Sequence, residues 1–205
     1  MTLFPKMVDI LSPGKSGDAE ITHFTVSEQE SRFTAMRNVL HPGSYVQPGS
    51  YAQLTVGRTL MMTDTRNEQR TNFEVVYKAN GHVFIAGLGI GMILHPIAAK
   101  PEVTKITVLE KSQGVIDLVK GTLPTKVEVV QGDIFEYKPE KGTKFDCIYF
   151  DIWPDINTDN LPEMATLHRR FARCKTPGGW MGSWCRDQLK SRQRSEKRRG
   201  SRYGW

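Results

Sequence analysis

A short apolar run that breaks into three alternating glycines constrains this chain more than any other feature. Residues 83–92 read V-F-I-A-G-L-G-I-G-M, with Gly87, Gly89 and Gly91 following the run. This pattern predicts a buried strand, a tight turn and the beginning of a helix. Glycine has no Cβ atom, so the turn can adopt positive φ and let a ligand approach the backbone. The free N–H groups of the following helix would favour an anion.

Glycines after a strand also form ordinary turns, so the rest of the chain must distinguish a turn from a ligand-binding loop. After the glycines the sequence predicts helices at 90–99, 112–120 and 161–174, and strands at 105–109, 127–130, 145–150 and 180–184. Pro96 lies inside the first helix and should kink or shorten it. Alternating strands and helices imply a parallel sheet covered on both faces. We therefore predict an α/β fold with a Rossmann-like parallel sheet.

The first 80 residues are expected to form an extension with a β-hairpin and a helix. A predicted loop (12–17), helix (28–40), hairpin (51–56 with 59–62) and second helix (71–79) follow one another. The loop contains G-K-S, but it lacks the preceding strand and the spacing of a phosphate-binding loop. The hairpin turns at Gly57-Arg58. We divide the chain into an N-terminal extension (1–80), a Rossmann-like cofactor-binding domain (81–186) and a basic tail (187–205).

The positive charge of the chain is confined to its C-terminal end. Residues 186–205 hold eight Lys or Arg and two acidic residues, which accounts for the whole net charge of +6. The tail, 187–205, has almost no apolar side chain to bury, so we expect a disordered segment or a frayed helix, and favour disorder. It could attract a nucleic acid or an acidic partner, although a merely solvated tail has the same composition.

Other features narrow the class of protein. No apolar run is long enough to span a membrane, and the N-terminus lacks a signal-peptide pattern. Cys147, Cys174 and Cys185 lack the spacing of metal ligands, which predicts reduced thiols and no metal site. We expect a cytoplasmic protein without membrane partners.

Acidic residues stand at the ends of three successive predicted strands: Glu110, Asp133 and Asp151. Ligands of parallel α/β sheets bind beyond the carboxyl ends of the strands, where the strand order reverses. A single acid there usually caps a helix, but three acids together with the glycine turn favour a site. Glu110 follows Gly91 by 19 residues. That spacing is typical of a carboxylate that accepts hydrogen bonds from ribose hydroxyls, so we expect a ribose-bearing ligand.

These segments resemble the class I S-adenosylmethionine-dependent methyltransferases, and within them the spermidine-synthase-like branch, over about residues 70–185. The resemblance is carried by G-L-G-I-G (87–91), I-T-V-L-E (106–110), V-E-V-V-Q-G-D-I-F-E (127–136), F-D-C-I-Y-F-D (145–151) and K-T-P-G-G-W (175–180). A nicotinamide dinucleotide is a less favoured ligand, because Met92 occupies the last glycine position of G-x-G-x-x-G.

The resemblance implies S-adenosylmethionine as cofactor and a role for each matching residue. The methionine part of the cofactor would be lined by Gly87, Gly89 and Gly91. Glu110 would hold the ribose hydroxyls, and Asp133 would accept from the adenine amino group, with the backbone of Ile134 beside it. Asp151 would lie near the sulfonium and the acceptor as the catalytic residue. No acid precedes Gly87, so Gln53 or Glu74 is our candidate for contacting the cofactor's amino group.

Departures from the family leave alternatives open. Asp155 follows Asp151 by four residues, whereas the second aspartate of spermidine synthases follows by three, which argues against polyamine recognition. The main hypothesis is therefore a methyltransferase of unknown acceptor, a small amine or another group. The alternatives are an aminopropyltransferase and a non-catalytic module that binds nucleic acid through its tail.

The chain ends soon after its fifth predicted strand, so the last two strands of the family are missing. An open sheet edge must be covered by the hairpin, the tail or a second subunit. We therefore expect a homodimer.

Overall fold

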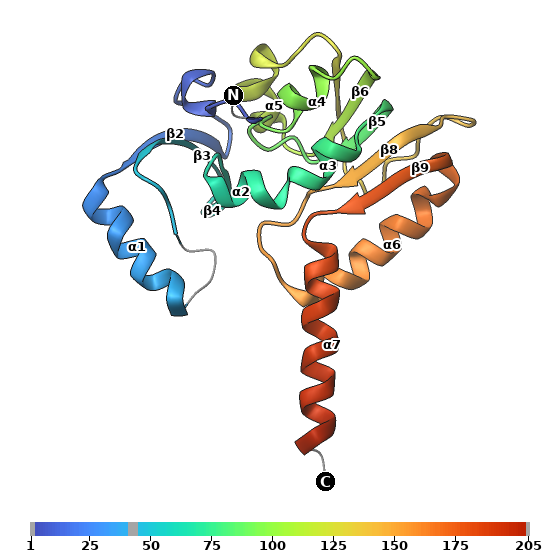
Figure 1. Ribbon diagram of the computed structural model, residues 1–205. Helices are drawn as coiled ribbons and strands as arrows, with labels where there is room; N and C mark the ends of the chain where they lie inside the picture. Colours follow the sequence, from blue (N-terminus) through green and yellow to red (C-terminus); the bar gives the residue numbers. More distant parts are fainter. Residues whose placement is uncertain (1–2, 41–44, 204–205) are drawn as a thin grey trace.

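The computed structural model describes residues 3–40 and 45–203, whose strands form two sheets (Figure 1). The central sheet has the order β7-β6-β5-β8-β9, and all of its neighbouring strands are parallel. Its strands are β5 (Gly81–Ala86), β6 (Val103–Glu110), β7 (Val127–Gln131), β8 (Phe145–Phe150) and β9 (Lys175–Ser183). The strand order reverses between β5 and β8, which makes their carboxyl ends the switch point of the sheet. The predicted Rossmann-like α/β fold is confirmed.

Strand β5 lies at the centre because it is apolar on both faces, as a covered parallel strand must be. Val83 and Ile85 face one core, whereas Phe84 faces the other, and all three are fully buried. On the second face, the ring of Phe84 stacks on Phe171 at 5.2 Å between centroids. Alternate side chains of one strand thus hold the two layers of the domain together.

The crossover helices are α4 (Leu94–Ala98), α5 (Gln113–Val119) and α6 (Leu161–Phe171), with 3-10 turns η2 (Lys120–Thr122), η3 (Thr158–Asn160) and η4 (Ala172–Cys174). Helix α4 is shorter than the predicted 90–99, because Gly91 still has φ +75° and the helix begins only at Leu94. Pro96 therefore falls in the first turn, where its missing N–H has no helical partner to lose. Ser112 caps α5, as expected, by accepting from Val115 N.

The N-terminal extension forms an antiparallel sheet of β1 (Gly14–Ser16), β2 (Ala19–Val26), β3 (Gly49–Val56) and β4 (Thr59–Thr63), preceded by η1 (Met7–Asp9). The hairpin at Gly57 and helix α1 (Glu28–Leu40) are confirmed. The loop predicted for 12–17 is wrong at β1, whose three residues become a strand by pairing with β2.

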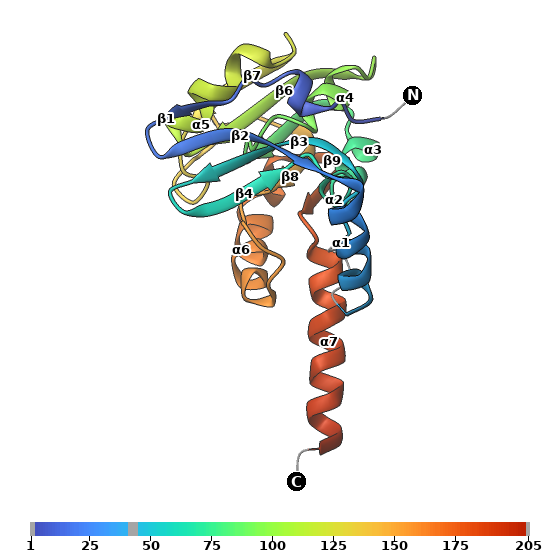
Figure 2. The same ribbon diagram turned by 90° about the vertical axis from the view of Figure 1, so that its left-hand side faces the viewer.

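This sheet lies over the central sheet (Figure 2). Gly114 of α5 makes the close approach possible, because a Cβ there would overlap the carbonyl oxygen of Ser16. The Ser16 hydroxyl also donates to Asp117 of α5 at 2.8 Å. The turn after β1 is thereby held beside the N-terminal end of α5.

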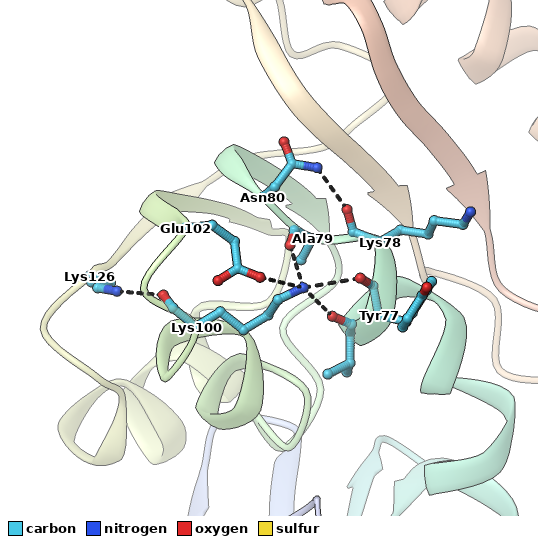
Figure 3. A network of polar contacts seen from close by, with 8 residues as sticks. Tyr77, Lys78, Ala79, Asn80, Lys100, Glu102 and Lys126 are labelled. Carbon is cyan, nitrogen blue, oxygen red and sulfur yellow. Dashed lines mark hydrogen bonds and ion pairs between the residues drawn. The ribbon is translucent and has the colours of Figure 1, made fainter.

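Two short helices, α2 (Arg66–Thr71) and α3 (Phe73–Lys78), connect the sheets in place of the single helix predicted over 71–79. Lys100, after α4, holds the end of α3 (Figure 3): its ammonium donates to the backbone carbonyls of Val76, Tyr77 and Ala79 at 3.0, 3.0 and 2.5 Å. A cation at a helix C-terminus satisfies carbonyls that lack helical partners. The connecting segment is therefore fixed to the central domain.

Helix α7 (Arg186–Tyr203) projects away from both sheets (Figure 1). Disorder is therefore wrong for 187–203. Leu189 is buried in the core and anchors the helix, and Arg192 pairs with Glu196 one turn later at 3.0 Å. Helix-favouring Lys, Arg and Gln then extend it. Within the described residues no helix is long and apolar enough to cross a membrane.

The outer edge of β9 has no strand beside it within the described residues. The strand begins at Lys175, earlier than the predicted 180–184. The hairpin belongs to the other sheet, and α7 leads away from this edge. A homodimer through this edge stays a prediction.

Candidate functional site

A cavity of about 770 Å³ lies at the carboxyl ends of the central strands, roofed by the N-terminal extension. This volume is in the usual range of small-molecule sites. The central domain contributes Gly87, Leu88, Gly89, Glu110, Asp133, Ile134 and Asp151, among others. The extension contributes Gly17, Asp18, Leu54, Val56, Met61, Met62 and Glu68. The structure thus brings together residues from four strand ends and from the antiparallel sheet of the extension, where sequence reasoning had proposed only Gln53.

The glycine turn forms the floor of the cavity. Gly87 has φ +100°, and a Cβ at this position would overlap the carbonyl oxygen of Asp151. Gly89 has φ +51°, and a Cβ there would lie 2.5 Å from Met62 Sδ in the roof. Gly91 is not among the lining residues: its Cβ would contact the side chains of Leu123 and Val119 instead. Gly91 therefore serves close packing beneath the turn.

Glu110 connects the glycine turn to helix α5. Its two carboxylate oxygens accept from the backbone N–H groups of Leu88 and Ser112, both at 2.8 Å. Each oxygen has a further lone pair, so the carboxylate can still accept from a ligand. These two bonds fix its orientation at the cavity wall.

Asp133 lies in a fixed and ionised state at the next strand end. Its Oδ2 pairs with Lys111 Nζ at 2.9 Å, and its Oδ1 accepts from Phe135 N at 2.8 Å. The Lys111 hydrogen bond, followed by that of Phe135, lowers the pKa of Asp133. Ile134 beside it is buried, and its carbonyl accepts from Arg170. Lys111 also lines the cavity.

Asp151 has the opposite electrostatic character. Its backbone N–H donates to Ala86 O at 2.8 Å, which places the residue directly beside the glycine turn. Burial, with a smaller contribution from the charge of Glu68, raises the pKa of Asp151 to about 8. Burial also raises the pKa of Glu68 to about 7. Both groups therefore exchange protons near neutral pH.

Glu68 was missed by sequence reasoning, which proposed Gln53 or Glu74 for this side of the cavity. Neither of these two lines it: Gln53 donates to Thr22 on the neighbouring strand β2, and Glu74 is exposed on α3. Glu68 sits in a polar stretch that carries no helical periodicity. Only the fold of α2 turns it toward the cavity, so no local signal could have identified it.

Two tryptophans also line the cavity. Trp153 donates from Nε1 to Glu163 at 2.8 Å, and Trp184 donates to the Thr71 hydroxyl at 3.0 Å. Both rings are buried and line the cavity. Asp155 is exposed and does not line it.

The ionisable groups of the lining are mostly acidic. One ammonium, Lys111, stands against six carboxyl groups: Asp18, Glu68, Glu110, Asp133, Asp151 and Glu163. Such a lining attracts cations and repels phosphates. No group of three or more potential metal ligands occurs among the described residues.

No protein-family model matches the sequence, and no curated protein matches it either. Several solved structures, however, match the fold of this chain. Spermidine synthase from Thermotoga maritima aligns with a TM-score of 0.52 and 15% identity, over 84% of this chain and 55% of its own. That share is too large to be confined to residues 81–205, so it includes part of the N-terminal extension. At this identity, the match shows a shared fold.

Two methyltransferases align over a smaller part of the chain. SAM-bound CalS10, an amino pentose methyltransferase from Micromonospora echinaspora, gives a TM-score of 0.41 and 19% identity, over 56% of this chain and 46% of its own. The N-methyltransferase NodS from Bradyrhizobium japonicum, in complex with S-adenosyl-L-homocysteine, gives 0.45 and 15%, over 57% and 60%. The chain spans about half the length of the solved structures it matches.

Proposed function

We propose that the cavity binds S-adenosylmethionine and that the protein transfers its methyl group to an acceptor. The observation that carries the proposal is the joint lining of one acidic cavity by the glycine turn and the acids of three strand ends. A positively charged ligand of nucleoside type fits that lining. A pyrophosphate would meet six carboxyl groups, which argues against a nicotinamide dinucleotide.

The residues fit this cofactor by position and by chemistry. Gly87 and Gly89 leave room at the backbone, Glu110 has free lone pairs for ribose hydroxyls, and Asp133 is an ionised acceptor for an adenine amino group. When bound, the cofactor would supply an electrophilic methyl group on a cationic sulfur. Asp151, beside the turn, would stabilise positive charge and accept a proton from the acceptor. The methyl transfer itself needs mainly alignment of the two reactants.

Calorimetric titration tests the cofactor assignment. We expect wild type to bind S-adenosylmethionine and to bind NAD at least ten-fold more weakly. Glu110→Ala should bind S-adenosylmethionine about 10- to 100-fold more weakly, because it loses charge-assisted hydrogen bonds. Glu110→Gln keeps the shape of the side chain and guards against misfolding of the alanine variant. Glu128→Ala, an exposed acid on β7, is the matched control and should bind normally. Unchanged binding by both Glu110 variants would refute the assignment.

An aminopropyltransferase is the less favoured enzyme. The acid that would mark polyamine recognition, Asp155, does not line the cavity and is exposed. Turnover of decarboxylated S-adenosylmethionine in the presence of a polyamine would reverse this ranking.

Nucleic-acid binding by α7 is a second candidate function. The helix is rigidly anchored at Leu189, and its exposed side chains include Arg192, Arg194, Lys197 and Arg198. A cationic helix that projects into solvent can follow a phosphate backbone.

Substitution of these four residues by Gln tests the second function without exposing the core that Leu189 covers. We expect wild type to bind a 20-base-pair DNA with a steep salt dependence. The quadruple variant should lower the slope of log K against log salt by about 3 to 4, at roughly 0.9 per phosphate contact. The matched control replaces four exposed lysines elsewhere, Lys15, Lys78, Lys138 and Lys141, by Gln. Equal slopes for the two quadruple variants would exclude α7 as the binding element.

A further inference from the structure

Helix α1 is attached to the extension through polar side chains. The buried Ser31 hydroxyl donates to the carbonyl of Val46 at 2.7 Å, and the Thr34 hydroxyl accepts from the N–H of the same valine at 3.1 Å. The helix begins at a capping box, in which Ser27 N–H donates to Glu30 at 2.8 Å and Glu30 N–H donates back to Ser27 Oγ at 3.2 Å. Ser31 is the one buried residue of α1 among those whose burial the structure describes. No apolar side chain therefore fixes this helix to the molecule.

The apolar side chains of α1 face the solvent instead. Phe33, Met36 and Val39 keep 69%, 73% and 82% of their surface exposed. They recur every third residue, and at about 3.6 residues per turn their common direction is roughly opposite to that of Ser31 and Thr34. An amphipathic helix of a single chain normally turns its apolar side to the core. The reversed orientation of α1 indicates a surface that contacts a partner.

The described part of the chain does not reach this surface. Figure 1 shows α1 at the margin of the molecule, beyond the sheet of the extension and away from the central sheet. Within the 205 residues, the segments outside the described part are 1–2, 41–44 and 204–205. Four extended residues span at most about 14 Å. A helix of 13 residues is about 20 Å long, so none of these segments can cover it.

The charges of α1 fit a second copy of the same helix. Glu28 and Glu30 lie in its first turn and Arg37 in its last turn, and all three are exposed. Antiparallel packing of two copies brings the acidic end of each helix beside the basic end of the other, and it also opposes the two helix dipoles. Parallel packing would bring like charges together. A two-fold symmetric interface requires this self-complementarity.

An anionic surface, such as a lipid bilayer or a nucleic acid, fits α1 less well. The exposed Arg32 and Arg37 are balanced by Glu28 and Glu30, and Arg32 already lies 3.8 Å from Glu28. Helices that bind anionic membranes carry an excess of Lys and Arg beside their apolar face. The charges of α1 therefore favour a partner of matching sign pattern over a uniformly negative one.

We propose that α1 is a dimerisation helix, whose apolar face packs antiparallel against the same face of a second copy of this chain. The proposal goes beyond the proposed function and does not depend on it, because none of the described residues of α1 lines the cavity. It places the two-fold axis at the extension, whereas a dimer through the open sheet edge would place it at β9.

The size of the apolar face sets the expected strength of the dimer. Phe33, Met36 and Val39 expose on the order of 400 Å² together, about half of what each partner buries in a standard interface. The stems of Gln29 and Arg32 can add area at the rim. An interface of this size is at the low end of the stable range, so we expect a dissociation constant on the order of 10 μM.

Sedimentation equilibrium on the full chain, from about 1 to 200 μM, tests the proposal, because dimer formation follows mass action. We expect the average mass of wild type to rise with concentration toward twice the 23.2 kDa of the chain. The variant Phe33→Gln/Met36→Gln/Val39→Gln should dimerise at least about ten-fold more weakly, since it lacks the centre of the interface. Gln favours the helix, so α1 should persist.

The matched control alters another exposed apolar pair. Phe73 and Tyr77 of α3 are 53% and 70% exposed, and Phe73→Gln/Tyr77→Gln should dimerise as wild type does. Urea unfolding at about 1 μM, where wild type is mostly monomeric, checks the fold of each variant. The triple α1 variant should unfold at the wild-type midpoint, because its substituted side chains are already in water in the monomer.

Charge reversal tests the antiparallel arrangement without touching the apolar face. Arg37→Glu should weaken the dimer by about five-fold, because two acidic ends then meet twice across the two-fold axis. Glu28→Lys/Arg37→Glu exchanges the two ends of each helix, so opposite charges meet again. The double variant should return to within about two-fold of the wild-type dissociation constant.

The outcomes that would overturn the proposal are distinct. Wild type that stays monomeric over the whole concentration range shows that a second copy does not cover α1. A triple variant that dimerises like wild type places the interface elsewhere, with the edge of β9 as the first alternative. Equal weakening by the α3 control shows unspecific association of apolar surface. A double charge variant weaker than Arg37→Glu excludes antiparallel packing. Cofactor binding enters none of these measurements, so failure of the proposed function leaves the test intact.

Discussion

Gly87→Ala is expected to lower the free energy of unfolding by more than about 3 kcal/mol and to abolish cofactor binding. The residue has φ +100°, which L side chains rarely adopt, and an added Cβ would overlap the backbone carbonyl of Asp151. The clash is with backbone, so no side-chain rotation can relieve it. The loop after β8 would have to move, and it carries the proposed catalytic residue. Urea unfolding measures the stability.

Gly142→Ala is the control that separates the cost of backbone strain at positive φ from the cost of the overlap with the Asp151 carbonyl. Gly142 has a similar φ of +91°, but nothing lies within 4 Å of its added Cβ. Its substitution should cost only the backbone strain, about 1–2 kcal/mol, and leave cofactor binding intact. Equal losses of unfolding free energy in Gly87→Ala and Gly142→Ala would mean that the collision with the carbonyl oxygen of Asp151 adds nothing to the cost of backbone strain.

Asp151→Asn should stabilise the protein at alkaline pH. The pKa of Asp151 rises from 3.8 to about 8 on folding, so the folded protein holds a proton that the unfolded chain has lost. Stability is therefore fully present below pH 3.8 and is lost as the pH rises to about 8. The asparagine variant escapes this loss. At pH 8.5 its advantage over wild type should be on the order of 6 kcal/mol, at about 1.4 kcal/mol per pKa unit, and it should vanish near pH 4. Urea unfolding across this pH range measures both.

Asp133→Asn provides a control of opposite sign. Lys111 and Phe135 lower the pKa of Asp133, so its carboxylate contributes stability above its ordinary pKa. The asparagine variant should therefore be less stable than wild type at pH 8. Glu68→Gln should act in the same direction as Asp151→Asn over the narrower window from pH 4.5 to about 7. A stability difference between Asp151→Asn and wild type that does not depend on pH would contradict the assigned pKa.

The central sheet could be predicted from sequence because its signals are local. The run before Gly87 is apolar without interruption, as a strand covered on both faces must be, and positive φ at the turn requires glycine. The acids at 110, 133 and 151 follow from the same pattern, since parallel strands bring their carboxyl ends to one edge. Gly91 is the exception, because its neighbours Leu123 and Val119 are remote in sequence.

The roof of the cavity could not be predicted, because it depends on contacts between distant segments. Strand β1 has three residues and exists by pairing with β2, and Gly114 admits that hairpin only after α5 has formed beneath it. Glu68 reaches the cavity through the placement of a six-residue helix. The segment of α7 was predicted to be disordered or a frayed helix, with disorder favoured, because its composition is almost entirely polar. Leu189 is the buried residue that anchors the helix among those whose burial the structure describes.

The N-terminal extension, which roofs the cavity, is synthesised before the glycine turn that forms its floor. Residues 17–68 leave the ribosome before the glycine turn at 87–91 and well before Trp153 and Trp184. The hairpin β3–β4 has short-range contacts and can form early, whereas the parallel sheet must wait for β8 and β9. Until then Leu54 and Met62 have no central domain to cover them. The nascent chain therefore exposes an apolar surface during translation, and the cavity closes only when the C-terminal third arrives.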